Sequence, residues 1–120
     1  MNKKKLLFII RHCPYGNLLA KESLDAILAA SVYEQVLSVL FLDDGVFQLL
    51  AQQITEPTEQ KNISKLLSAF SLYEINAVSV CQSSLHQRGL DETDLCIAVK
   101  LLDINEIQML MQKQDQLLSF

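Results

Sequence analysis

Two uninterrupted apolar runs constrain the fold of this chain more than any other feature of its sequence. Leu6 to Ile10 is entirely apolar, and Val36 to Leu42 contains a single polar residue, Ser38. A strand with one face in water alternates apolar and polar residues, whereas a parallel strand covered by helices on both faces is apolar throughout. The two runs therefore predict inner strands of a parallel sheet that is covered on both sides.

The remaining elements are predicted from apolar periodicity and from turn residues. Helices are expected at 18–33, 46–50, 59–70, 85–88 and 105–113. Further strands are expected at 77–81, 94–101 and 116–120, and a loop at 51–57. Strands and helices thus alternate along the whole chain.

Polar residues at two of the predicted helix starts are expected to act as caps. Asp43 or Asp44 can cap the helix after the second strand, and Ser83 or Ser84 can cap the helix after the third. Gly89 is suited to the left-handed backbone conformation that ends a helix.

The alternation of elements predicts an α/β fold. We expect one domain over residues 1–120, a three-layer sandwich with a mainly parallel sheet of about five strands. Functional groups in such sheets gather beyond the carboxyl ends of the strands. The residues expected at this edge are Cys13, Asp43, Asp44 and Cys81. Cys96 lies inside the predicted strand 94–101, where a buried, inert thiol is expected.

Composition excludes several classes of function. The net charge of −4 lacks the basic footprint of a nucleic-acid-binding protein, so no direct contact with nucleic acid is expected. The apolar run that ends at Arg11 is too short for a signal peptide or a membrane span, which predicts a cytoplasmic protein without membrane contact. An apolar fraction of 50% indicates that other subunits cover part of the surface.

Neither a cofactor nor a metal is expected from the motifs. The three cysteines have no C-x-x-C spacing, and His12 and His86 fit no metal-binding pattern. The turn after the first strand holds only one glycine, Gly16, and therefore lacks a phosphate-binding loop. The Asp43-Asp44 pair favours a capping turn over a metal site, because no further ligands accompany it.

Cys81 is the candidate catalytic residue. It lies where an apolar strand gives way to a helix, and the positive end of a helix dipole, with Arg88 nearby, favours thiolate over thiol. A thiolate can take sulfane sulfur from a donor and release it to an acceptor thiol. The alternative interpretation is a small core residue.

The two histidines are weaker candidates. His12 and Cys13 can be read as a base and a nucleophile, but neighbours in an extended segment point to opposite sides, which favours surface loop residues. His86 is typical of a solvated helix face.

Five short motifs occur in this order along the chain: Pro14-Tyr15-Gly16, Glu22 to Ala29, Asp44 to Leu50, Val80 to Leu90 and Phe120. Together they resemble the DsrE/DsrF/DsrH-like sulfur-relay family, most closely its TusC (DsrF-like) branch. The similarity covers nearly the whole chain.

The resemblance implies a small α/β subunit that assembles with TusB-like and TusD-like subunits into a heterohexamer of two copies each. Such a complex takes persulfide sulfur from a TusA-like donor and passes it to a TusE-like acceptor, for 2-thiolation of the wobble uridine of tRNA. In the family the sulfur-carrying cysteine belongs to the TusD-type subunit. Cys81 matches its position, but the TusC branch implies an assembly subunit and not the catalytic one.

Two alternatives stay open. In the first, Cys81 itself carries a persulfide. In the second, the chain is a DsrF-like subunit of a dissimilatory sulfur-oxidation complex, with the same chemistry in another pathway.

Overall fold

The chain folds around a sheet of five parallel strands in the order β4-β3-β2-β1-β5. The computed structural model describes residues 4–12, 19–32, 35–50, 67–70, 75 and 77–120. The strands are β1 (Lys4–Ile10), β2 (Gln35–Phe41), β3 (Val78–Cys81), β4 (Lys100–Leu102) and β5 (Gln116–Ser119). The helices are α1 (Leu19–Ala30), α3 (Gln82–Gln87) and α4 (Ile104–Gln112), with 3₁₀ helices η1 (Asp43–Leu49) and η2 (Glu92–Asp94).

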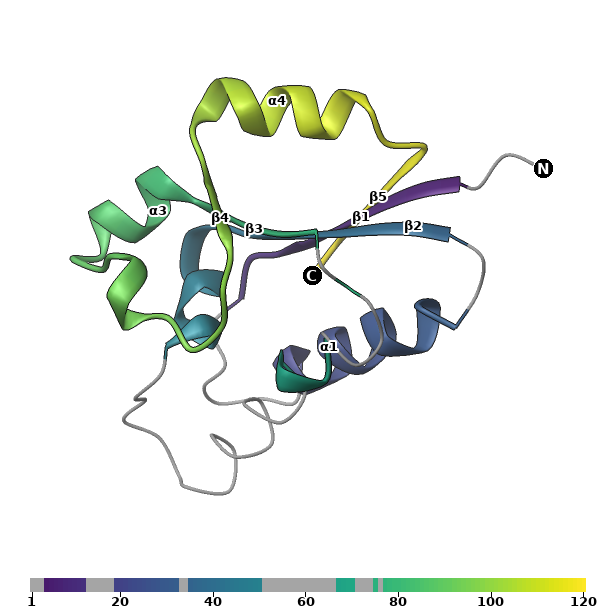
Figure 1. The fold of residues 1–120 in the computed structure, drawn as a ribbon, viewed down its shortest axis with the longest axis horizontal. Coiled ribbons are helices and arrows are strands. Elements are labelled where there is room, and N and C mark those ends of the chain that lie inside the picture. The colour runs from purple at the N-terminus through teal and green to yellow at the C-terminus, as the bar shows by residue number, and fades with distance from the viewer. Residues whose placement is uncertain (1–3, 13–18, 33–34, 51–66, 71–74, 76) are drawn as a thin grey trace.

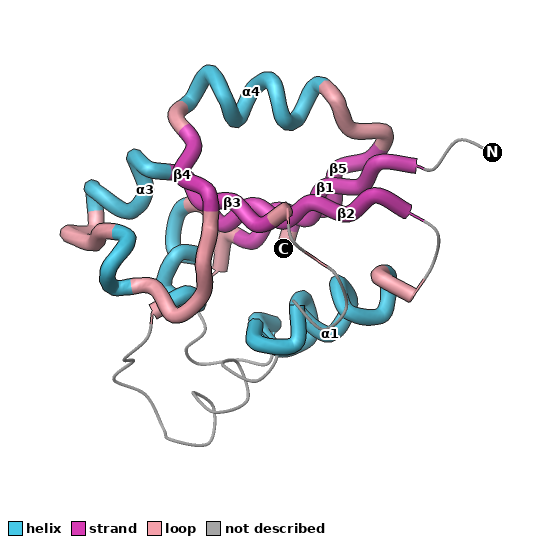
Figure 2. The backbone as a smooth tube through the Cα atoms, in the orientation of Figure 1, coloured by secondary structure: helices cyan, strands magenta, loops and turns pink. Residues whose placement is uncertain are grey.

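Helices cover both faces of the sheet, which Figure 1 shows edge-on, with α4 above the strands and α1 below them. Figure 2 shows the strands as one twisted layer between these helices. We call the two sides of the sheet the α4 face and the α1 face. The predicted α/β fold, with a parallel sheet of about five strands flanked by helices, is confirmed.

Strand β1 explains why the first apolar run is uninterrupted. It lies inside the sheet, where Phe8 pairs with Val39 of β2 and with Leu118 of β5. Its side chains are buried from Leu6 to Ile10, and they alternate between the hydrophobic clusters of the two faces. Both sides of β1 therefore exclude water, as the sequence predicts.

The α1 face carries the larger hydrophobic cluster. It joins β1, β2 and β3 to α1, η1, α3 and the helical residues 67–70. The members that are fully buried include Leu24, Ile27, Phe41, Val46 and Leu49.

The α4 face carries a smaller cluster, which α4 is the one described helix to cover. Its buried members are Leu7, Ile9, Leu40, Leu102 and Ile107. Around this cluster the surface stays partly apolar: Ile104 is 65% exposed and Met109 is 56% exposed, and both belong to α4.

The predicted strand 94–101 is wrong over residues 94–99. The Asp91 carboxylate accepts the backbone N–H of Thr93, while the Asp94 carboxylate accepts the N–H of Asp91, and this capping box starts η2 instead of a strand. Extended pairing with β3 begins only at Lys100. Cys96 therefore lies outside any strand and is exposed, which contradicts the expected buried thiol.

Other boundaries differ by a few residues. Helix α1 ends at Ala30 and not at 33, and α3 begins at Gln82. Gly89 follows α3 with a φ of 70°, as predicted for a left-handed helix end. The predicted loop 51–57 and most of the predicted helix 59–70 lie outside the described residues.

Candidate functional site

The carboxyl edge of the sheet brings together the residues that the sequence placed there, as far as the structure describes them. Asp43 and Asp44 follow β2, and Cys81 ends β3. Cys13 lies outside the described residues, and His12, which the sequence favours as a surface loop residue, is exposed. This edge has two regions, one around Cys81 and one around the two aspartates.

Cys81 is both the last residue of β3 and the N-cap residue of α3, with an extended backbone at φ −72° and ψ 114°. Its side chain packs against the cluster of the α4 face and is half-buried. The thiol thus lies on the α4 face, which carries the smaller hydrophobic cluster. The sulfur is partly accessible, and this degree of exposure is compatible both with a relay cysteine and with a small core residue.

The predicted serine cap of α3 is wrong. Helix α3 has no side-chain cap, and the hydroxyl of Ser84 instead accepts the backbone N–H of Asp43 at 3.0 Å. Ser84 therefore ties α3 to η1 and does not satisfy the first N–H groups of its own helix. These groups remain at the helix end next to Cys81.

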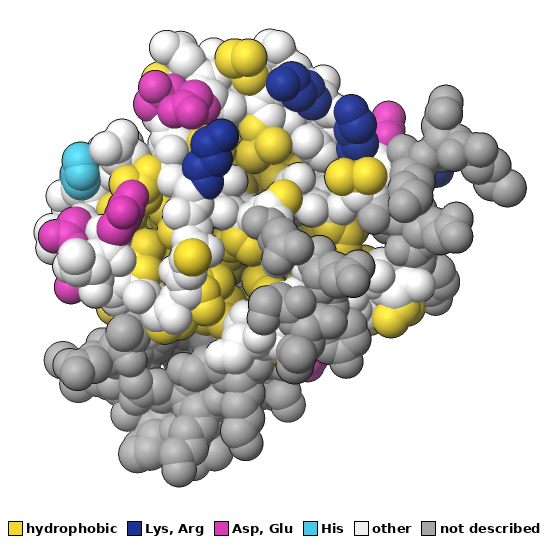
Figure 3. Space-filling model, viewed as in Figure 1, with side chains coloured by type: hydrophobic (Ala, Val, Ile, Leu, Met, Phe, Trp, Pro, Cys, Tyr) yellow, Lys and Arg dark blue, Asp and Glu magenta, His cyan; other side chains and the backbone are white. Residues whose placement is uncertain are grey.

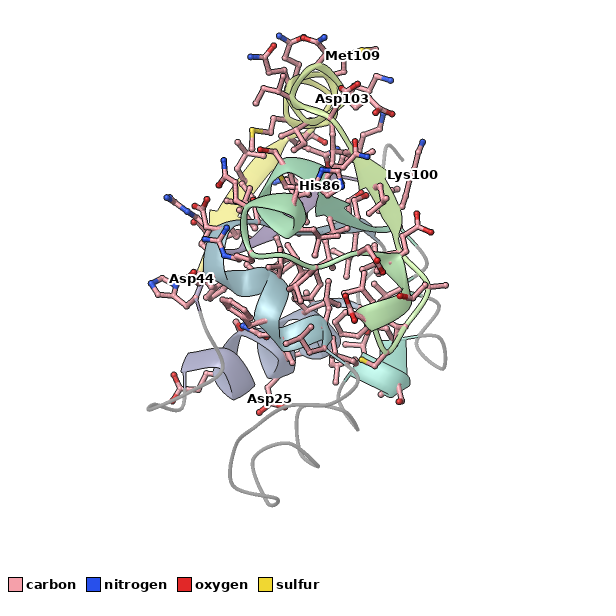
Figure 4. All side chains as sticks on the ribbon, turned by 90° about the vertical axis from the view of Figure 1, so that its left-hand side faces the viewer. Asp25, Asp44, His86, Lys100, Asp103 and Met109 are labelled. Carbon is pink, nitrogen blue, oxygen red and sulfur yellow. The ribbon has the colours of Figure 1, made fainter. Side chains whose placement is uncertain are left out.

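A pocket of about 480 Å³ begins one residue beyond Cys81, between α3 and α4. Its lining residues are Gln82, Ser83, His86, Gln87, Asp103 and Ile104. His86 is exposed there, as Figure 4 shows on the near side of α3, in keeping with a solvated helix face. The pocket offers hydrogen-bonding groups close to the thiol.

The aspartates do not cap η1, contrary to the sequence prediction. The cap residue is Leu42, without a side-chain hydrogen bond, and Asp43 has a φ of 51°. A left-handed backbone is uncommon outside glycine, although aspartate tolerates it better than most residues. The chain turns sharply here because the next residues must pass close to β1.

Gly45 makes this close passage possible. A Cβ atom at this position would overlap the carbonyl oxygen of Ile10 and lie 3.1 Å from the backbone nitrogen of Arg11. Only glycine leaves room for η1 to rest on the end of β1.

Two ion pairs hold the edge together. The Nε atom of Arg11 lies 3.2 Å from Asp43, and a terminal nitrogen of Arg88 lies 2.9 Å from Asp44. Arg88 also donates to the carbonyl oxygen of Ser84 at 3.1 Å and lies over the ring of Phe47. The hydrogen bonds of Arg88 are thus made to η1 and α3, and none of those described goes to Cys81.

Cys96 follows η2, and its backbone N–H donates to the carbonyl oxygen of Leu49, the last residue of η1, at 2.7 Å. Neighbouring protein atoms withdraw water from its sulfur and raise the pKa of the thiol, although the residue is exposed by surface area. A raised pKa disfavours thiolate. Cys81 is therefore the better candidate for sulfur chemistry among the described cysteines.

A metal site is not formed by the described part of the chain. There, no three His, Cys, Asp or Glu side chains lie close enough together to hold an ion. Among the same residues, no helix is long and apolar enough to cross a membrane.

Comparison with known proteins decides the family. The model of the DsrE/DsrF-like family matches residues 4–120. The chain belongs to the DsrE/DsrF-like family. The TusC homolog of Vibrio vulnificus (strain CMCP6) is 42% identical over 116 residues, which cover 97% of this chain and 98% of that protein. The resemblance inferred from the short motifs is confirmed.

A second relative is named for sulfur oxidation and is not called a TusC homolog. The intracellular sulfur oxidation protein DsrF of Allochromatium vinosum is 34% identical over 131 residues, covering 98% of this chain and 96% of that protein. Among solved structures, the ychN protein of E. coli superposes with a TM-score of 0.81 at 22% identity, covering 98% of this chain and 99% of that one. This likeness supports the DsrE/DsrF-like fold.

The sequence did not reveal how this DsrE/DsrF-like chain connects η1 to β1 and α3. The ion pairs of Arg11 and Arg88 join residues more than thirty positions apart, and no local pattern marks them. Gly45 did carry a signal, since a glycine in the turn that follows a buried strand can mark a close approach of two backbone segments.

Proposed function

We propose that this chain is a TusC-like subunit of a TusBCD-type sulfurtransferase complex. In this role it assembles in the cytoplasm with TusB-like and TusD-like subunits into a heterohexamer. The complex relays persulfide sulfur from a TusA-like donor to a TusE-like acceptor, for 2-thiolation of tRNA wobble uridine. The chain acts mainly through assembly, as one domain over residues 1–120.

The identity to TusC homologs over nearly the whole chain is the observation that carries this proposal. The thin α4 face supports it, because Ile104 and Met109 leave apolar surface in water that a partner would cover. The acidic net charge fits a subunit that meets proteins and not tRNA.

Co-expression with TusB-like and TusD-like subunits tests the assignment. We expect one species on size-exclusion chromatography that contains all three chains in equal amounts. A chain that elutes alone, without either partner, would contradict the proposal.

A second candidate function is that Cys81 itself carries the sulfur. The half-buried thiol lies at a helix start, beside the pocket between α3 and α4. In this step the Cys81 thiolate attacks the outer sulfur of a donor persulfide. The new S–S bond forms as the donor's S–S bond breaks, and the electron pair leaves on the donor thiolate.

Mass spectrometry after incubation with a persulfide donor tests this candidate. The expected adduct adds the mass of one sulfur atom, disappears in Cys81→Ser and persists in Cys13→Ser and Cys96→Ser. An adduct that survives Cys81→Ser would rule Cys81 out as the carrier.

The match to DsrF of Allochromatium vinosum supports a third candidate, a subunit of a dissimilatory sulfur-oxidation complex. The chemistry is the same, and only the pathway differs. Deletion of the gene distinguishes the two, because loss of tRNA 2-thiouridine identifies the first pathway and loss of sulfur oxidation the second.

A further inference from the structure

A groove runs along the α4 face, between α4 and strands β3 and β4. It has a volume of about 370 Å³, and its floor includes Ser79 and Leu102. Met109 and Leu110 of α4 form its apolar wall. The groove is therefore a hollow with apolar walls beside the smaller cluster of the α4 face.

Two lysines of this groove have no counter-ion among the described residues. Lys100 from β4 and Lys113 after α4 belong to its lining, and neither forms an ion pair within the described part of the chain. The third charged residue, Glu106, directs its carboxylate to the backbone N–H of Asp103 at 3.1 Å, as part of the α4 capping box. Positive charge thus flanks the groove on a chain whose net charge is −4.

The surface shows the same arrangement. In the upper half of Figure 3, dark-blue basic side chains surround yellow apolar surface below α4. Figure 4 places Lys100 and Met109 on the upper right, away from Asp44 on the left. Unpaired lysines around an apolar hollow are complementary to an apolar segment that carries carboxylates.

We propose that this groove receives an acidic, apolar segment of a partner subunit. The apolar side chains of that segment enter between Met109 and the floor of the groove, and its carboxylates meet Lys100 and Lys113. A protein segment is favoured over a small ligand because the apolar surface continues out of the groove along Met109, which is 56% exposed. An unbranched methionine also adapts readily to a partner surface.

The inference rests on the proposed function, since the partner is a subunit of the same complex. A competition experiment tests it: the wild-type chain and a variant, carrying different tags, are co-expressed with limiting TusB-like and TusD-like subunits. The ratio of the two chains in the purified complex is then measured by mass spectrometry. Lys100→Glu and Lys113→Glu are the test variants, and Lys4→Glu, an exposed lysine at the start of β1, is the matched control.

We expect each groove variant to be under-represented by about tenfold, because like charges then face each other, and the control to enter the complex equally. A second measurement does not depend on charge reversal. A photo-crosslinking amino acid at position 109 should capture a partner peptide rich in Asp or Glu, whereas the same group at exposed Glu22 of α1 should not.

Three results overturn the inference. Equal incorporation of the groove variants, or a crosslink from position 109 to a segment without carboxylates, refutes the groove and leaves the subunit assignment intact. If even the wild-type chain enters no complex, the proposed function fails, and the inference fails with it.

Discussion

The two faces of the sheet differ in how completely the chain covers them. Among the described residues, the cluster of the α1 face has fifteen buried members, whereas that of the α4 face has five. Among these residues, several helices from distant parts of the chain pack on the first face, and α4 alone packs on the second. The difference indicates that the α1 face supplies most of the stability of the folded subunit and that the α4 face is available for contacts with other molecules.

The largest effect is expected from a matched pair of cavity substitutions. Ile27 on α1 is fully buried, and Ile107 on α4 is almost as buried but packs in the smaller cluster beside a groove. Ile27→Ala should lower the free energy of unfolding by about 4 kcal/mol and Ile107→Ala by about 2 kcal/mol, because the thinner face relaxes more easily around a cavity. Denaturant unfolding measures both.

The conservative changes Ile27→Val and Ile107→Val serve as controls, with about 1 kcal/mol expected for each. Equal losses of unfolding free energy for the two alanine variants would contradict the conclusion that the α1 face contributes more to stability than the α4 face.

A substitution at Gly45 tests how tightly the α1 face is packed at its carboxyl edge. Gly45→Ala forces a methyl group against Ile10, so we expect a loss of about 3 kcal/mol in unfolding free energy. Gly89→Ala is the control, since the space that its methyl group would enter is open to 4 Å and only the left-handed backbone opposes the change. A loss of about 1 kcal/mol is expected there, and a similar loss at both positions would argue against close packing at Gly45.

The attachment of α4 depends on its capping box. The Asp103 carboxylate accepts the N–H of Glu106 at 2.8 Å, and Asp103→Ala should cost about 1 kcal/mol of stability. The backbone amides of α4 should exchange hydrogen faster in this variant, and the exchange rates of the α1 amides should not change. Asp103→Asn, which keeps an acceptor, should behave like the wild type; faster exchange in α1 would mean that the two faces do not open independently.

The two ion pairs should differ in strength. The Arg88 side chain is 20% exposed and the Arg11 side chain 56% exposed. Arg88→Met should therefore cost about 1 kcal/mol, and Arg11→Met about 0.3 kcal/mol. Thermal unfolding in low and high salt measures both losses. A larger loss of stability for Arg11→Met than for Arg88→Met would contradict the expected order of the two ion pairs.

The smallest effect is a pH dependence at Asp91, which begins the connection that carries Leu95 and Ile97 to the α1 face. The Thr93 hydroxyl, and after it the Thr93 backbone N–H, holds the pKa of Asp91 below its ordinary value of 3.8. A lowered pKa adds stability above that value, and this stability disappears as the pH falls through the folded-state pKa. NMR titration of the carboxyl carbon should give a midpoint below 3.8 that rises in Thr93→Ala; an unchanged midpoint would contradict this cause.

Sequence reasoning predicted the parts of the fold that depend on local pattern. The apolar runs of β1 and β2, the helical periodicity of α1 and α4, and the left-handed Gly89 were read correctly because each is determined by near neighbours. The helix caps were predicted wrongly because they depend on distant residues. Ser84 accepts a hydrogen bond from Asp43, forty-one residues away, and the carboxylates of Asp43 and Asp44 form ion pairs with Arg11 and Arg88. Cys81 was located at the sheet edge, but its position under the thin α4 face depends on the whole fold.

The sheet order also has a consequence for the synthesis of the protein. Strand β1 pairs with β5, the last strand of the chain, and Leu7 and Ile9 are covered by residues of α4 and its surroundings. A ribosome releases β1 well before α4 and β5, so these apolar side chains lack this cover until the later elements emerge. The nascent chain therefore exposes an aggregation-prone surface over this interval, and production of the folded subunit will be sensitive to chaperones that bind apolar segments.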